Sequence, residues 1–84
     1  METLQLRNAL IRIRKEEFGF TMFDGNKSIQ ANESFVLILK MIAYGDSAKK
    51  IEDQLRTEYQ IPPNKNLLQD IESVVKFCEK MGWM

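Results

Sequence analysis

The side chains with catalytic potential in this sequence are carboxylates and serines that have no histidine beside them. Asp70 and Glu72 are close along the chain. Residues two apart on a helix point to different sides, so these two do not form the carboxylate pair that acid–base catalysis uses. The serines have no histidine partner, because the chain contains no histidine. We therefore expect no catalytic residues and predict that the protein is not an enzyme.

Metal and disulfide chemistry are equally poorly supported. The single cysteine, Cys78, follows Val74 and Val75 and precedes Met81, which is typical of a small side chain in an apolar core. Without histidine or a second cysteine the chain lacks the ligands of a transition-metal site. We expect no metal, no cofactor and a reducing, cytoplasmic environment.

Charge and length restrict the partners. The 84 residues carry 12 basic and 12 acidic side chains, so no net field draws the protein to nucleic acid or to an anionic membrane. The N-terminal sequence has no signal-peptide pattern, and no apolar run has the length of a membrane span. A chain of this size is expected to form one domain, residues 1–84, with a single core.

Alternation of apolar and polar residues predicts three strands in the first part of the chain. Residues 9–14 form the first and residues 18–22 the second, with apolar side chains on one side of each. Asp24-Gly25 then tolerates the positive φ angles of a tight hairpin turn. Residues 27–30 are the return strand.

Helical spacing replaces this alternation from Asn32, whose side chain is suited to cap a helix that runs to about Tyr44. A second, amphipathic helix is expected to begin after Asp46 or Ser47 and to reach Tyr59.

The third helix is expected to follow the break at Ile61-Pro62-Pro63. Pro63 suits a first helical turn, and the pattern continues to about Met81. The expected core line of this helix is Leu68, Ile71, Val75 and Cys78. Three strands followed by three helices predict an α+β fold with a three-stranded antiparallel sheet and the helices on one face. Such a sheet leaves two open edges.

Several segments, taken in order, form one pattern. They are Phe18-Gly19, the Asp24-Gly25 turn, Ala31-Asn32-Glu33-Ser34, Tyr44-Gly45-Asp46-Ser47, the Ile51, Leu55 and Tyr59 ladder, Asp70-Ile71 and Gly82-Trp83. This pattern, over roughly residues 9–84, resembles the PqqD-like family of peptide recognition elements from ribosomal natural-product pathways. Glu17-Phe18-Gly19 is also similar to the corresponding chaperone of mycofactocin biosynthesis. Ala31 and Cys78 depart from the larger aliphatic residues that the family more often has.

The resemblance implies a winged helix-turn-helix fold that captures the leader segment of a precursor peptide as an added strand. It also implies that the chemistry belongs to a separate modifying enzyme, such as a radical S-adenosylmethionine enzyme or a leader peptidase. The docking edge would be Lys27, Ser28, Ile29, Gln30 and Ala31. The third helix would wall the groove with Asp70, Val74, Phe77 and Met81, a stripe offset from the expected core line.

Two other classes remain open. A winged-helix DNA-binding protein would use the third helix for recognition, although the lysines of that helix are balanced by acidic residues. A structural module would form a homodimer through the open strand edge or through Met81-Gly82-Trp83-Met84, where Trp83 is expected to be exposed. For Phe77 the sequence leaves both a groove position and a core position open.

Overall fold

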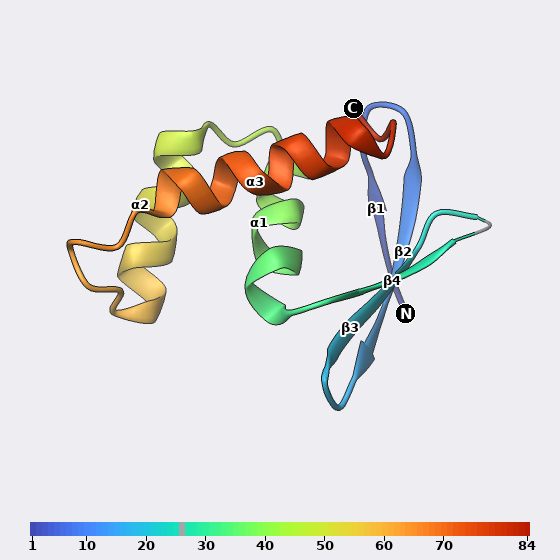
Figure 1. The fold of residues 1–84 in the computed structure, drawn as a ribbon, viewed down its shortest axis with the longest axis horizontal. Coiled ribbons are helices and arrows are strands. Elements are labelled where there is room, and N and C mark those ends of the chain that lie inside the picture. Colours follow the sequence, from blue (N-terminus) through green and yellow to red (C-terminus); the bar gives the residue numbers. More distant parts are fainter. Residues whose placement is uncertain (26) are drawn as a thin grey trace.

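The computed structural model describes residues 1–25 and 27–84 and has an α+β fold (Figure 1). Four strands form one antiparallel sheet in the order β1-β2-β3-β4, and three helices follow it along the chain. The strands are β1 (Glu2–Gln5), β2 (Leu10–Glu16), β3 (Gly19–Phe23) and β4 (Ser28–Ala31). The helices are α1 (Glu33–Ala43), α2 (Ala48–Tyr59) and α3 (Leu67–Lys80).

The expected strand count is wrong by one, because the sequence prediction missed β1. This strand pairs with β2 and places Leu4 opposite Ile11. Leu4 is the only buried residue of β1, and a four-residue edge strand with one buried side chain gives a weak alternation signal. The other three strands lie close to their expected ranges.

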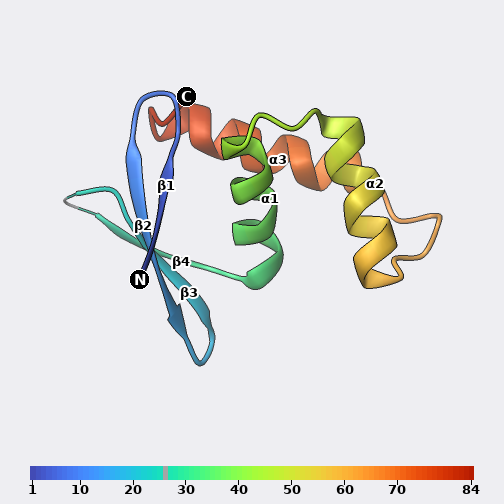
Figure 2. The same ribbon diagram turned by 180° about the vertical axis from the view of Figure 1, so that it is seen from behind.

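The sheet has one covered face and one open face. Figures 1 and 2 show all three helices on the same side of the sheet, with α1 nearest to it and α3 crossing from α2 towards the β1–β2 turn. Helix α1 contacts β1 and β3, and α3 contacts both α1 and α2. The expectation that the helices share one face is confirmed.

Each helix begins at a polar cap. Asn32, Ser47 and Asn66 accept a hydrogen bond from the backbone N–H three residues later, which satisfies a donor at each helix start. The cap expected at Asn32 is confirmed, and of the two alternatives for the second helix, Asp46 and Ser47, the structure uses Ser47. Helix α3 begins later than expected, because residues 62–65 close a turn in which Lys65 N–H donates to the Pro62 carbonyl at 3.0 Å.

The core differs from the expected one in the face of α3 that it uses. Its buried residues on α3 are Leu67, Ile71, Val74 and Cys78, whereas Leu68 is 47% exposed. Because Leu67 and Leu68 are adjacent and both apolar, the sequence does not show which of them faces the core. In the structure it is Leu67. Trp83 is also wrongly expected to be exposed, since only 2% of its surface is accessible.

Candidate functional site

Strand β4 is an outer strand of the sheet, as expected for the docking edge. It pairs with β3 on one side, with Met22 opposite Ile29 and Thr21 opposite Gln30. Ile29 and Ala31 are half-buried on the helix side, while Ser28 and Gln30 are exposed. Lys27, which the sequence placed in the strand, lies one residue before β4 and is exposed.

The pairing pattern shows which β4 amides face the open edge. Asp24 N–H donates to the Lys27 carbonyl at 3.2 Å, so Asp24 and Lys27 form a hydrogen-bonded pair. Such pairs alternate with non-hydrogen-bonded pairs along an antiparallel ladder. The register therefore gives Ile29 a hydrogen-bonded partner in β3 and turns the N–H groups of Ser28 and Gln30 outwards.

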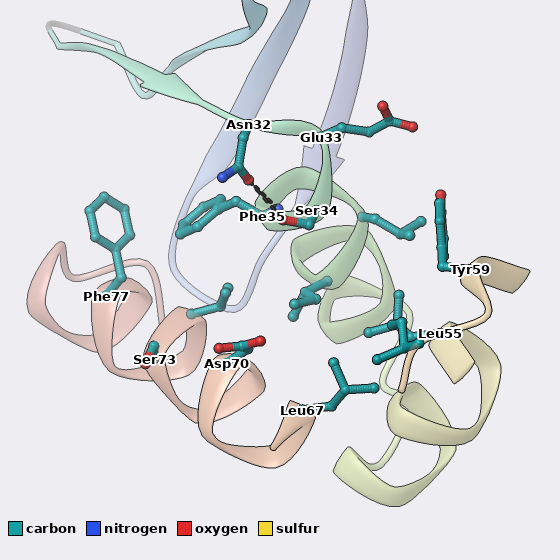
Figure 3. Close-up of a pocket in the computed structure, with 14 residues that line it drawn as sticks. Asn32, Glu33, Ser34, Phe35, Leu55, Tyr59, Leu67, Asp70, Ser73 and Phe77 are labelled. Carbon is teal, nitrogen blue, oxygen red and sulfur yellow. Dashed lines mark hydrogen bonds between the residues drawn. The ribbon is translucent and has the colours of Figure 1, made fainter. Parts of the chain in front are cut away.

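A mainly apolar cavity of about 620 Å³ lies between the three helices (Figure 3). Its walls come from the start of α1, the end of α2, the α2–α3 connection and one side of α3. The lining residues are Asn32, Glu33, Ser34, Phe35, Leu37, Ile38, Leu55, Tyr59, Ile61, Leu67, Asp70, Ser73, Val74 and Phe77. Because Asn32 directly follows β4, the cavity begins where the edge strand ends.

The structure brings together only some of the residues expected in the groove. Asp70, Val74 and Phe77 line the cavity, but Met81 and the β4 residues do not. Val74 is 4% exposed and belongs to the core as well. The sequence did not predict the cavity residues on α1 and α2. Ile61 could have been noticed, because an apolar residue directly before two prolines indicates a connection that packs against the rest of the protein.

Phe77 occupies both of the positions that the sequence left open. Its half-buried ring lines the cavity and also meets the Phe35 ring edge-on, with centroids 5.3 Å apart. On the other side it meets the Trp83 ring at 5.5 Å. Edge-to-face contacts of this kind hold aromatic rings in defined positions. Phe77 therefore forms a fixed wall of the cavity.

Trp83 ties the end of α3 to two turns of the sheet. Its indole Nε1–H donates to the Asp24 carboxylate at 3.1 Å, next to the β3–β4 turn. Its backbone carbonyl accepts from Asn8 N–H at 2.8 Å in the β1–β2 turn. These contacts hold the C-terminal end of α3, a few residues after Phe77, against the sheet.

The charges at the cavity are acidic and partly balanced. Glu33 is exposed in the first turn of α1, and the Asp70 carboxylate lies 3.6 Å from Lys65 Nζ. Farther along α3, Lys76 pairs with Glu72 at 3.1 Å. Lys76 is thus paired with an acidic side chain of its own helix.

The Cys78 thiol should be chemically silent in the folded protein. It is fully buried, and burial together with the nearby Glu79 charge raises its pKa from 9.0 to about 11. As the pH rises, the thiol ionises at a lower pH in the unfolded chain than in the folded protein. The stability that the neutral, buried Cys78 thiol contributes is therefore complete below pH 9 and is lost as the pH rises towards 11. At pH 8 a thiol reagent should react with Cys78 no faster than the protein unfolds.

Reaction of the native protein at the rate of a free thiol would contradict this expectation. The measurement needs no site assignment, because Cys78 is the single cysteine. Cys78→Ala provides the control for the pH dependence of stability between pH 9 and 11, which should be reduced in that variant.

Within residues 1–25 and 27–84, no group of histidine, cysteine and carboxylate side chains is arranged to hold a metal ion. None of the described helices is long and apolar enough to cross a membrane. Comparisons with protein-family models, with curated proteins and with solved structures find no match to this chain.

Proposed function

We propose that this protein is a non-catalytic peptide-recognition module with a winged helix-turn-helix-like arrangement. It captures an extended segment, the leader of a ribosomal precursor peptide, by strand addition at β4. It then presents the attached core peptide to a separate modifying enzyme. The observation that carries this proposal is the combination of an outer strand with a mainly apolar cavity at the end of that strand.

The two parts of this site supply different components of recognition. The outward N–H groups of Ser28 and Gln30 offer main-chain hydrogen bonds that depend little on the peptide sequence. The cavity offers apolar contact to a peptide side chain, with Phe77 as its fixed aromatic wall. In β-strand addition, main-chain hydrogen bonds to the edge strand usually supply the affinity, and side-chain pockets supply the selectivity.

The position of the cavity supports one path for the ligand. A peptide that adds to β4 and continues past Ala31 reaches the start of α1, where Asn32 and Glu33 border the cavity. Holding the leader in this way raises the local concentration of the core peptide at a bound enzyme, to about the millimolar range for a short flexible connection. A radical S-adenosylmethionine enzyme and a leader peptidase are the two partner classes that the proposal includes.

Gln30→Pro tests strand addition without breaking the sheet. Proline removes the outward N–H of Gln30 and places a ring at the edge, while the Ile29 N–H that pairs with β3 stays intact. We expect binding of a peptide selected from a randomised library to weaken at least about tenfold, since one hydrogen bond and the edge geometry are lost. Fluorescence anisotropy with the labelled peptide measures the change.

Thr3→Pro is the matched control on the opposite edge. Leu6 N–H donates to the Ala9 carbonyl, so the same alternation turns the Thr3 N–H of β1 outwards. This variant should bind the peptide like the wild type. Unchanged affinity in a folded Gln30→Pro protein, or equal loss in both variants, would refute docking at β4. If the open edge of β4 instead bound a second copy of the chain, the protein would form a dimer whose fraction rises with protein concentration.

A further inference from the structure

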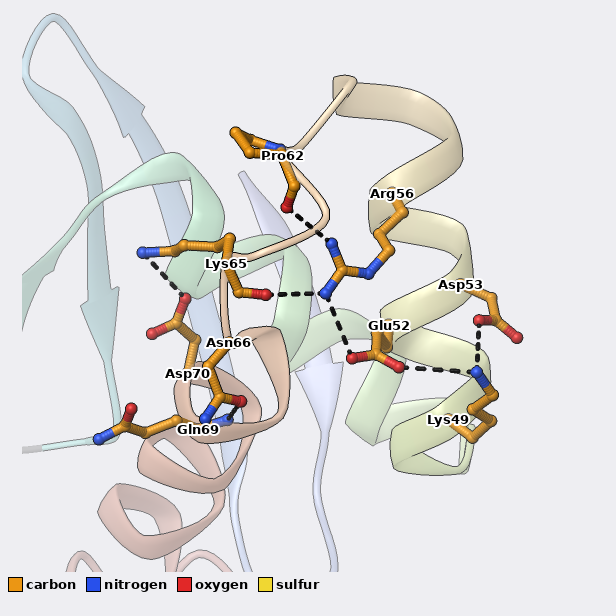
Figure 4. Close-up of polar contacts among 9 residues, drawn as sticks. All are labelled: Lys49, Glu52, Asp53, Arg56, Pro62, Lys65, Asn66, Gln69 and Asp70. Carbon is orange, nitrogen blue, oxygen red and sulfur yellow. Dashed lines mark hydrogen bonds and ion pairs between the residues drawn. The ribbon is translucent and has the colours of Figure 1, made fainter.

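Arg56 of α2 ties the α2–α3 connection to the helix (Figure 4). Its Nη1 donates to the Pro62 carbonyl at 3.0 Å, and its Nη2 donates to the Lys65 carbonyl at 2.7 Å. Nη2 also lies 3.6 Å from the Glu52 carboxylate, one turn earlier on α2. The side chain is 29% exposed, so the guanidinium is partly shielded from water.

The segment that Arg56 holds is one wall of the cavity. Gln60, the residue that follows the end of α2, has φ +47°, which is the one positive φ at a non-glycine residue within the described part of the chain. Ile61 follows and lines the cavity, as does Leu67 at the other end of the connection. Residues 62–66 between them are exposed and contribute no buried side chain to the core.

A guanidinium is suited to this role in a way that an ammonium is not. Its planar fork presents several N–H donors in fixed directions and can satisfy two carbonyls at once, whereas lysine acts as a point charge. Pro62 and Lys65 lie at the two sides of one turn, which is also closed by the hydrogen bond from Lys65 N–H to the Pro62 carbonyl. The fork therefore fixes the turn as a unit relative to α2.

We infer that Arg56 is a positioning residue that fixes the Ile61–Leu67 wall of the cavity and thereby determines which apolar side chain the cavity accepts. This inference rests on the proposed function, because it assigns the selectivity of the same site. Arg56 acts through the Pro62 and Lys65 carbonyls. Loss of these two hydrogen bonds should leave the packing of the three helices in place and loosen the segment between Ile61 and Leu67.

The test uses side-chain analogues as probes, so that it does not depend on identifying the natural peptide. Toluene and indole represent the side chains of phenylalanine and tryptophan. Their binding to the full chain is followed by the NMR shifts of the Ile38 and Leu67 methyl groups inside the cavity. We expect wild-type Kd values on the order of millimolar, with indole tighter than toluene because its two fused rings make more van der Waals contacts with the cavity walls.

Arg56→Gln and Arg56→Lys should both weaken indole at least fivefold and remove the difference between the two analogues. Trypsin cleavage after Lys65, measured as the fragment that begins at Asn66, should become at least tenfold faster. Thermal unfolding of each variant shows whether it folds. A general loss of stability alone would not abolish the indole preference, so the preference separates positioning from a structural role.

Lys49→Gln is the matched control. Lys49 lies 3.7 Å from Glu52 and 3.1 Å from Asp53, so this change removes another cation beside Glu52 without touching the connection. It should leave binding and cleavage unchanged.

Wild-type behaviour of both Arg56 variants, or an equal loss in Lys49→Gln, would overturn the inference. It would also be overturned if the wild type bound neither analogue, whereas docking at β4 is judged separately by Gln30→Pro.

Discussion

Replacing Trp83 with alanine should lower the free energy of unfolding by about 3–5 kcal/mol, the usual cost of removing a large aromatic side chain from a core. Trp83 is 2% exposed, and its ring packs against Phe77. The change also removes the indole hydrogen bond to Asp24. A domain of this size has a stability of ~4–13 kcal/mol, so the loss is between about a quarter of the total and all of it. Urea denaturation followed by far-UV circular dichroism measures the loss.

Trp83→Phe separates packing from the hydrogen bond. Phenylalanine keeps an aromatic ring beside Phe77 but cannot donate to Asp24, and we expect a smaller loss, about 1–3 kcal/mol. Asp24→Ala should lose a similar amount, because it leaves the indole N–H without its partner. A loss below about 1 kcal/mol in Trp83→Ala would show that the end of α3 is not anchored to the sheet through this residue.

Gly19→Ala should destabilise the protein by about 2–4 kcal/mol through two separate effects. The first is backbone strain, since Gly19 has φ +143°, which side-chain-bearing residues rarely adopt. The second is a collision, because an added Cβ would lie 2.7 Å from the Ala31 carbonyl oxygen. Ala31 ends β4 and precedes the cap of α1, so relief of the clash must displace the edge strand from β3.

Gly45→Ala is the control for the strain alone. Gly45 has φ +85°, but a Cβ there would meet nothing within 4 Å. We expect about 1 kcal/mol for this variant, the cost of a left-handed conformation without a clash. Thermal or urea unfolding of the pair measures the difference. Equal losses in Gly19→Ala and Gly45→Ala would contradict a close approach between the start of β3 and the end of β4.

The features that could be predicted from the sequence depend on neighbours along the chain. The cap at Asn32 could be predicted, and the second cap could be narrowed to Asp46 or Ser47, because a capping side chain reaches a backbone N–H only three residues away. Strands β2, β3 and β4 follow from alternation and from the Asp24-Gly25 turn. The outer position of β4 agrees with the edge that the family resemblance implied, and the structure shows it as the last strand of a simple meander.

The features that could not be predicted depend on contacts between distant residues. The burial of Trp83 requires Asp24, 59 positions away. The choice of Leu67 over Leu68 for the core depends on how α3 lies against α1 and α2. The cavity is likewise formed by segments from all three helices, and its far wall needs Arg56 to hold a connection that the sequence had assigned to the first turn of α3.

Amide hydrogen exchange of β4 with and without a library-selected peptide is the most direct test of capture by strand addition. We predict that the Ser28 and Gln30 amides, which face the open edge, become strongly protected on binding. The Thr3 amide on the opposite edge should exchange as before. A peptide that binds while Ser28 and Gln30 exchange at their free rates, or that protects Thr3 instead, would contradict docking at β4.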